Sequence, residues 1–171
     1  MNIYMNLNNY IFVIPGGGGK TTLSKKGSCY IDIDDYWDIN GETEKKMIKE
    51  WKEAMANNNK DIVQKLINDC MDYKALKLKK SLKEENKIIL VQSVNQAKII
   101  SNFRKNIFCF IPSVELHESL MNNRNDTDYV KNICRNQRND IIKSGWEYTI
   151  YNNFDELDIL IKKLKINFFK F

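Results

Sequence analysis

The chain has 171 residues, of which 43% are hydrophobic, so it is long and apolar enough for one folded domain and too apolar for a disordered chain. Only two prolines and seven glycines occur, and four of the glycines fall in one short stretch, which leaves few residues for flexible linkers. The net charge of +5 is compatible with binding of phosphorylated ligands or nucleic acid, and equally with lysine-rich solvated helix faces.

Four widely spaced cysteines form no C-x-x-C pair, which is typical of reduced thiols and argues against a disulfide framework or a zinc site. The N-terminus lacks the basic region and long apolar core of a signal peptide. No apolar run approaches the roughly 18 residues of a membrane span. We therefore expect an intracellular, cytoplasmic protein that does not enter a membrane.

The first predicted strand covers residues 10–14, after a short polar lead-in over 1–9. Its apolar residues are continuous, which is typical of a strand buried on both faces of a parallel sheet. Consecutive glycines follow, and a short helix is predicted over 20–26, ended by Gly27. The residues of the turn and the helix start are Pro15, Gly16, Gly17, Gly18, Gly19, Lys20, Thr21 and Thr22.

A glycine-rich turn between a buried strand and a helix is the setting of a phosphate-binding P-loop. Glycines let backbone N–H groups turn inward around an anion, and the helix adds the positive end of its dipole. We predict that the four glycines, Lys20, Thr21 and Thr22 bind the phosphates of ATP or another NTP. Lys20 is expected to reach the β- and γ-phosphates, and the Thr21 hydroxyl to bind Mg²⁺. The alternative is a glycine-rich connector, which rarely has a strand before it and a helix after it.

The loop departs from the full pattern G-x-x-x-x-G-K-[ST] at its first glycine, because that position holds Ile14. The proline of the related pattern G-x-P-G-x-G-K-T also comes one place early, at Pro15. We expect this departure to affect turnover more than phosphate binding.

An acidic stretch, Asp32-Ile33-Asp34-Asp35, ends the second predicted strand, 29–33. Residues two apart on a strand point to the same face, and ligands of open α/β sheets bind at the carboxyl ends of strands. We therefore predict that Asp34 is a catalytic base and that Asp32 holds Mg²⁺, with Asp35 able to substitute for either. The alternative is that these aspartates only cap the turn before Tyr36-Trp37.

The rest of the chain alternates strands with helices, which predicts parallel β-α-β units in a single three-layer α/β domain without internal repeats. Helices 42–57 and 61–82 each carry an apolar stripe, the first with Met47, Trp51, Ala54 and Met55 and the second with Ile62, Leu66, Cys70 and Tyr73. The basic run at 74–80 is expected to be a solvated helix face rather than a nucleic-acid patch. The further strands are predicted at 88–91, 107–111 and 146–151, and the further helices at 95–103, 114–122, 128–143 and 155–164.

The third strand ends in Gln92-Ser93 without the acidic residue of a Walker B strand, which argues against a helicase or packaging motor. Phosphoryl transfer needs cations over the γ-phosphate, and Arg124, Arg135 and Arg138 are the candidates, with Lys131 a weaker one. Arg135 and Arg138 lie three residues apart and share a helix face. A solvated helix that happens to carry arginines is the alternative.

On these residues the chain resembles the P-loop kinases of small molecules and nucleic-acid ends. That group includes nucleoside and nucleotide monophosphate kinases, shikimate- and gluconate-type kinases, and polynucleotide 5′-kinases. The resemblance covers most of the chain as an order of elements, and it is sharpest at 10–23, weaker at 29–36 and weakest at 121–138. It implies a five-stranded parallel sheet in the order 2-3-1-4-5, ATP and Mg²⁺ as ligands, and a mobile arginine-bearing lid at about 121–143.

The expected activity is transfer of the γ-phosphate of ATP or another NTP to a nucleoside, a nucleotide or a nucleic-acid 5′-hydroxyl. A hydroxyl acceptor is preferred to a phosphate, because a phosphate acceptor needs no base such as Asp34. Two alternatives stay open, which are a nucleotide-binding structural or regulatory module without turnover and a simple NTPase that uses water.

The remaining candidate site residues are aromatic side chains and the single histidine. Trp37, Trp51 and Tyr36 could line an acceptor pocket, although aromatic residues at helical spacing more often belong to a core. His117 has no orienting partner in the sequence, so a surface or packing role is expected. The aromatic tail at 168–171 is expected to pack on the sheet or, if exposed, to contact a partner.

Overall fold

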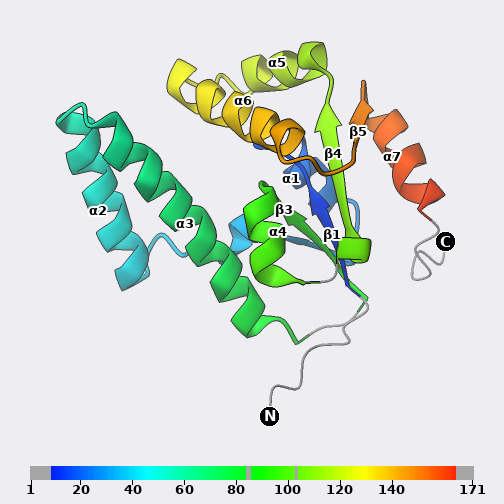
Figure 1. Cartoon of the computed structure of the whole chain (residues 1–171), viewed down its shortest axis with the longest axis horizontal. Coiled ribbons are helices and arrows are strands. Elements are labelled where there is room, and N and C mark those ends of the chain that lie inside the picture. Colours follow the sequence, from blue (N-terminus) through cyan, green and yellow to red (C-terminus); the bar gives the residue numbers. More distant parts are fainter. Residues whose placement is uncertain (1–8, 84–85, 103, 165–171) are drawn as a thin grey trace.

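A computed structural model describes residues 9–83, 86–102 and 104–164, so the aromatic tail lies outside the described residues. Its strands form one five-stranded, all-parallel sheet in the order β2-β3-β1-β4-β5 (Figure 1). The predicted α/β class and strand order are therefore confirmed. The strands are β1 Tyr10–Val13, β2 Tyr30–Asp32, β3 Ile88–Val91, β4 Ile107–Pro112 and β5 Tyr148–Tyr151.

Helices cover both faces of the sheet, which gives the predicted three layers. On one face, residues of α3, α4 and α6 pack against Ile11, Val13 and Ile89, and on the other, residues of α1 and α7 pack against Phe12 and Leu90. The helices are α1 Lys20–Ser24, α2 Glu42–Ala56, α3 Lys60–Ser81, α4 Val94–Ile100, α5 Val114–Asn123, α6 Asp128–Lys143 and α7 Phe154–Lys163, and the 3-10 turns are η1 Ile33–Tyr36 and η2 Arg104–Asn106.

Strands β1 and β3 form the centre of the sheet. All four residues of β3 are buried, as are three of the four residues of β1. Phe12 of β1 lies between Leu90 and Phe108 in the register of its two neighbours. Because both faces of these strands are covered, their sequences read as continuous apolar runs.

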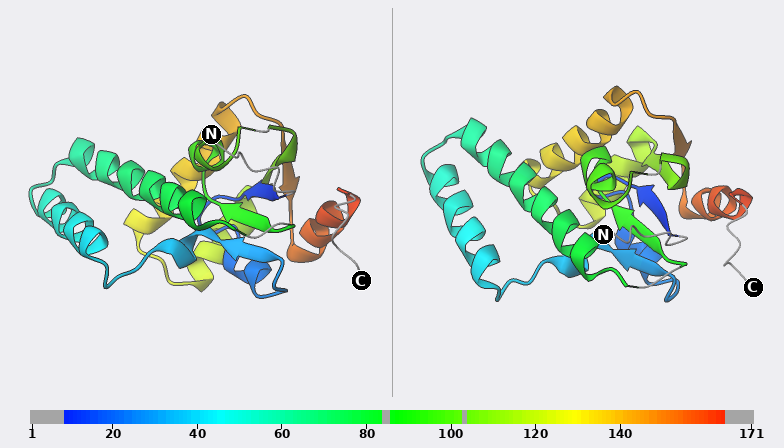
Figure 2. Two further views of the ribbon diagram at one scale, coloured as in Figure 1. Left: turned by 90° about the horizontal axis from the view of Figure 1, so that it is seen from below. Right: turned by 60° about the horizontal axis from the view of Figure 1, so that its bottom comes forward.

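Helices α2 and α3 form a hairpin that extends away from the sheet (Figures 1 and 2). Ala54, Val63 and Leu66 form a small core between them, with Trp51 and Tyr129 packed against it. Ile62 of the predicted stripe is nevertheless 47% exposed, whereas the next residue, Val63, is 6% exposed and belongs to this small core. In the described part of the chain, no helix is both long enough and apolar enough to cross a membrane.

Most predicted boundaries differ from the structure by one to three residues, and three of them bear on the packing. Helix α4 ends at Ile100, β2 ends at Asp32, and β5 begins at Tyr148 rather than at Trp146. The Trp146 ring is held instead by cations, with Lys98 Nζ 5.4 Å and Arg104 Cζ 4.2 Å from its centroid.

Candidate active site

Two side chains hold the glycine-rich loop by donating hydrogen bonds to its carbonyl groups. The Gly16 carbonyl accepts a hydrogen bond of 2.7 Å from His117 Nε2, and the Gly18 carbonyl accepts one from the Tyr151 hydroxyl. His117 is 1% exposed, and burial lowers the pKa of its ring, so a neutral imidazole supplies the Nε2–H. His117 therefore has a packing role rather than a surface one, and its contact is the loop itself.

The Gly16 amide faces a cavity, whereas the Gly18 N–H donates to the Pro15 carbonyl within the loop. Gly16 N–H donates a hydrogen bond of 2.8 Å to Gln137 Oε1, and both residues line this cavity. Gly17 and Gly19 have positive φ angles of 73° and 94°, which is the alternating backbone of an anion-binding nest. The Gln137 oxygen thus occupies the kind of position that a phosphate oxygen takes in a P-loop.

Ile14 replaces the first glycine of the motif without disturbing the loop. Its N–H donates to the Val91 carbonyl at 2.8 Å and so extends the β1 ladder by one residue. The side chain is fully buried beneath the loop, where a Cβ on Gly18 would lie 2.7 Å from Ile14 Cγ2. A glycine in this place would leave a gap under the loop, so the departure from the motif is accommodated by the core.

We expect Gly19→Ala to destabilise the protein by about 1–3 kcal/mol, because φ at this position is +94° and the new Cβ would lie 2.3 Å from the Phe154 ring. Urea denaturation measures this loss. The matched control is Gly27→Ala, whose Cβ would meet only Cys29 Sγ at 3.9 Å and whose effect should stay within about 0.5 kcal/mol. Equal effects of the two substitutions would contradict the strain assigned to Gly19.

Helix α1 begins at the loop without a side-chain cap, because its N-cap residue is Gly19. Helix α2 likewise starts at a glycine, Gly41, without a side-chain cap, whereas α3 to α7 all have side-chain caps. Lys20, Thr21 and Thr22 of its first turn line the cavity. Lys20 is 6% exposed, whereas Thr21 and Thr22 are exposed.

The acidic stretch is arranged differently from the sequence prediction. Strand β2 ends at Asp32, and Asp34 lies in the 3-10 turn η1, so the two do not share a strand face as predicted. Asp32 Oδ1 caps the turn by accepting from Asp34 N–H at 3.1 Å, and this tight turn directs Asp34 into the cavity. Asp32, which is 4% exposed, therefore caps the turn, and its role at Mg²⁺ stays a prediction, while Asp35 is exposed and makes no part of the cavity lining.

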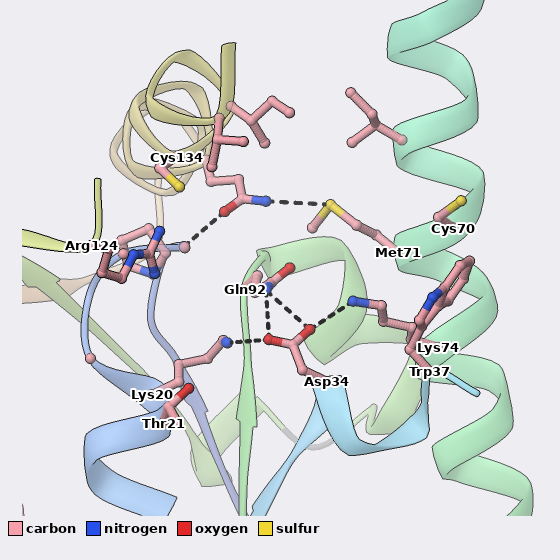
Figure 3. A pocket seen from close by; sticks show the side chains of 18 of the residues that line it. Lys20, Thr21, Asp34, Trp37, Cys70, Met71, Lys74, Gln92, Arg124 and Cys134 are labelled. Atoms are coloured by element: carbon pink, nitrogen blue, oxygen red, sulfur yellow. Dashed lines mark hydrogen bonds and ion pairs between the residues drawn. The ribbon is translucent and has the colours of Figure 1, made fainter. Parts of the chain in front are cut away.

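The Asp34 carboxylate is the meeting point of four elements (Figure 3). Lys20 Nζ of α1 lies 2.8 Å from Oδ2, and Lys74 Nζ of α3 lies 2.6 Å from Oδ1. Gln92 Nε2, just after β3, lies 3.0 Å from Oδ2 and 3.3 Å from Oδ1. Lys20 also approaches Asp32 Oδ1 at 3.5 Å. Asp34 is thereby fixed beside the P-loop lysine.

Burial and the neighbouring lysines together shift the pKa values of Asp32 and Asp34. Burial alone would raise the pKa of Asp34, but the ammonium groups of Lys20 and Lys74 outweigh it and lower the pKa to about 2. Burial raises the pKa of Asp32, and Lys20 offsets that rise only in part. Asp34 is therefore ionised at neutral pH and accepts hydrogen bonds. For Asp32, burial disfavours the charged form of the carboxyl group more than Lys20 favours it.

We expect the stability that Asp34 provides to be lost in acid. Its folded pKa of about 2 lies below the ordinary value of 3.8, so its contribution is present above pH 3.8 and disappears as the pH falls toward 2. The free energy of unfolding of the parent protein should therefore exceed that of Asp34→Asn at pH 7, and the difference should shrink between pH 4 and pH 2. Urea denaturation at several pH values measures it, with Asp35→Asn as the exposed control. A difference independent of pH would contradict the ion pairs.

The predicted arginines do not all reach the cavity. Arg124 lines it, and pairs with Asp126. Arg135 instead makes two hydrogen bonds to Glu118, at 2.6 and 2.7 Å, and Arg138 Nε donates to the Pro112 carbonyl at 3.0 Å. The roles expected of Arg135 and Arg138 at a γ-phosphate are not supported by this arrangement. The helix face that does line the cavity consists of Val130, Ile133, Cys134 and Gln137, without Lys131.

The cavity has a volume of about 630 Å³ and lies between the loop, the α2–α3 hairpin and α6. The expected lid at 121–143 corresponds to the end of α5 and all of α6, and its mobility stays a prediction. Trp37 and Trp51 both line the cavity, as the pocket hypothesis predicted, whereas Tyr36 packs against the core.

An ATP·Mg²⁺ complex fits the residues that are present. The loop already holds an acceptor oxygen, that of Gln137, on the Gly16 N–H. No group of three or more His, Cys, Asp or Glu among the described residues could hold a metal by itself. Mg²⁺ is usually held by one or two protein oxygens together with substrate phosphates, and the Thr21 hydroxyl lines the cavity where such an ion would enter with the nucleotide.

Three polar residues of the site were missed from the sequence, namely Lys74, Gln92 and Gln137. Gln92 follows a strand next to β1, so its position at the carboxyl edge was an available signal. Lys74 belongs to a basic run that was interpreted as solvated, and only the packing of α3 against η1 shows its contact with Asp34. No protein-family model and no curated protein matches the chain, so its function has to be inferred from the site.

Proposed function

We propose that the protein is a P-loop phosphotransferase that moves the γ-phosphate of ATP or another NTP to a hydroxyl acceptor. The observation that carries this proposal is the 2.8 Å contact between Lys20 Nζ and Asp34 Oδ2 at the floor of the cavity. It joins the phosphate-binding lysine to a carboxylate able to accept a proton, in a cavity of about 630 Å³. An NTP substrate also agrees with the expected intracellular location.

Each group has a role in this proposal. The loop amides bind the phosphates in place of Gln137 Oε1, and Lys20 turns from Asp34 to the β- and γ-phosphates. The Thr21 hydroxyl, together with the phosphates, would hold Mg²⁺, which would supply positive charge against the phosphate oxygens. Lys74 and Gln92 keep Asp34 in position when Lys20 has moved. Asp34 then accepts the proton of the acceptor hydroxyl.

The two alternatives, a binding module and a simple NTPase, predict different outcomes when an NTP binds at the same loop. A binding module without turnover is favoured by Gln92 in the place of a Walker B acid, and it would gain stability from NTP without transferring phosphate. A simple NTPase would release phosphate with water as acceptor. The Asp34 carboxylate beside Lys20 would serve turnover with either a hydroxyl or water as acceptor, so the acceptor is what distinguishes the phosphotransferase from the NTPase.

The test is transfer of label from γ-labelled ATP in the presence of Mg²⁺. Acceptors are deoxynucleosides, nucleoside monophosphates, and DNA and RNA oligonucleotides with free 5′-hydroxyls. Label on one acceptor class supports the phosphotransferase. Phosphate release without an acceptor supports the NTPase. If no acceptor is labelled while ATP raises the melting temperature, the phosphotransferase proposal fails and the binding module replaces it.

A further inference from the structure

The two sides of the cavity differ in chemistry (Figure 3). The loop side carries the backbone amides together with Lys20 and Arg124. The opposite side, which we call the hairpin side, is built from η1 and the residue after it, from α2 and from α3, and it is apolar apart from Asp34 and Lys74, whose ammonium lies 5.7 Å from the Trp37 ring centroid. Its lining side chains are Trp37, Met47, Trp51, Ile67, Cys70 and Met71.

The hairpin side lacks an available positive charge. Among the described lining residues, the cations are Lys20, Lys74 and Arg124. Lys20 belongs to the loop, and Arg124 lies on the loop side and pairs with Asp126 (Figure 3). The remaining cation, Lys74, is neutralised by Asp34 at 2.6 Å. A phosphate entering the hairpin side would meet the Asp34 carboxylate without an uncommitted cation to balance it, which is a large electrostatic cost.

The side chains present favour a flat, uncharged ring instead. Trp37 packs edge-to-face on Tyr73, with ring centroids 6.3 Å apart, and Trp51 packs on Tyr129 at 6.0 Å. These ring contacts fix the orientation of both indole side chains in the cavity lining. Met47 and Met71 add thioethers, which adapt to the faces and edges of aromatic rings. Apolar walls with a few polar groups at one end are the usual form of a small-molecule site.

We propose that the phosphoryl acceptor is an uncharged alcohol with a flat, largely apolar ring, bound on the hairpin side with its hydroxyl against Asp34. This inference rests on the proposed phosphotransferase function and narrows it. A nucleoside meets this description. Nucleoside monophosphates and nucleic-acid 5′ ends do not, because each brings a phosphate into the uncompensated side.

The transfer step balances with these groups. The acceptor oxygen forms a bond to the γ-phosphorus, and the bond from that phosphorus to the β,γ-bridging oxygen breaks. The electron pair of the broken bond leaves with the nucleoside diphosphate. The hydroxyl proton passes to the Asp34 carboxylate, which is ionised in the free protein.

Binding of matched pairs tests the charge requirement directly. Trp146 lies outside the cavity lining, so a Trp146→Phe background leaves Trp37 and Trp51 as the fluorescent reporters. Thymidine, uridine, cytidine, adenosine and guanosine are each titrated against their own 5′-monophosphates. At least one nucleoside should change the fluorescence in a saturable way and bind at least about tenfold more tightly than its monophosphate. Equal or tighter binding of the monophosphates, or no response to any nucleoside, overturns the inference.

A charge placed on the hairpin side provides a second test. Met71→Arg should reduce the preference for the nucleoside over its monophosphate by about tenfold, the equivalent of one charge-assisted hydrogen bond. The matched control is Leu76→Arg on the same helix, at a side chain that is 48% exposed and outside the cavity lining. An unchanged preference in Met71→Arg contradicts the inference.

The label-transfer assay on the same compounds separates this inference from the proposed function. Transfer to a nucleoside but not to its monophosphate supports both. Transfer to monophosphates or oligonucleotides overturns the acceptor class and leaves the phosphotransferase standing. Selective binding of nucleosides without transfer to any of them supports the binding preference and overturns the phosphotransferase.

Discussion

Replacement of Lys20 by methionine is expected to reduce phosphoryl transfer by about 10²–10³-fold, the usual effect of removing one donor to developing charge in the transition state. Methionine keeps an unbranched apolar side chain of similar length in a position that is 6% exposed, so the ammonium group is the main loss. The rate of label transfer from γ-labelled ATP at saturating nucleotide measures it. Affinity for ATP should fall as well, because the lysine contacts the β-phosphate in both ground and transition state.

Lys25→Met is the matched control, because Lys25 is exposed just after the same helix. Its transfer rate should equal that of the parent protein. Circular dichroism and urea denaturation of Lys20→Met show whether the buried Asp32 and the half-buried Asp34 tolerate the loss of their cation. A folded Lys20→Met protein that transfers phosphate at the parent rate would contradict the P-loop role of the lysine.

Most of the fold was predictable because it depends on patterns that are local in the sequence. The continuous apolar runs at 10–14 and 88–91 correctly indicated central parallel strands, since burial on both faces leaves no polar positions. The strand order came from the resemblance to P-loop kinases and is confirmed. Local patterns do not specify which side chains of α3 meet α2, so the exposure of Ile62 beside the buried Val63 was missed.

The candidate site was predictable in part, because some of its residues form local patterns in the sequence. The glycine run and Lys20 form a contiguous motif, and Asp34 follows the next strand of the chain, β2, which is separated from β1 only by β3. The two could therefore be brought together at the carboxyl edge of the sheet from the topology. The 3-10 turn was not predicted, because a periodicity argument that places Asp32 and Asp34 on one strand face assumes that the strand continues.

The arginine prediction was wrong about the helix face. Helix α6 directs Cys134 and Gln137 toward the cavity, whereas Arg135 contacts Glu118 of α5. A shift of one residue rotates the side chain by about 100° around a helix, so the orientation depends on packing with α5 and the sheet. Lys74 was missed because its contact with Asp34 joins residues 40 positions apart, which no local pattern indicates.

Replacement of Asp34 by asparagine is expected to reduce the transfer rate at saturating substrates by about 10²–10⁴-fold, the contribution typical of a positioned general base. Asparagine keeps the size of the side chain and can still accept hydrogen bonds from Lys74 and Gln92, but it cannot take the acceptor proton. ATP should bind as tightly as before or more tightly, because Lys20 no longer has to leave a carboxylate at 2.8 Å. Transfer rates and ATP affinity, measured on the same preparation, separate these effects.

Asp35→Asn is the matched control, because Asp35 lies in the same turn but is exposed and outside the cavity lining. It should keep the parent rate. If Asp34→Asn lost ATP affinity in parallel with its rate, Asp34 would act by holding Lys20 in place and not as a base. If it transferred phosphate at the parent rate, the carboxylate would have no part in the reaction, and the paired lysines would remain as a structural support for the loop.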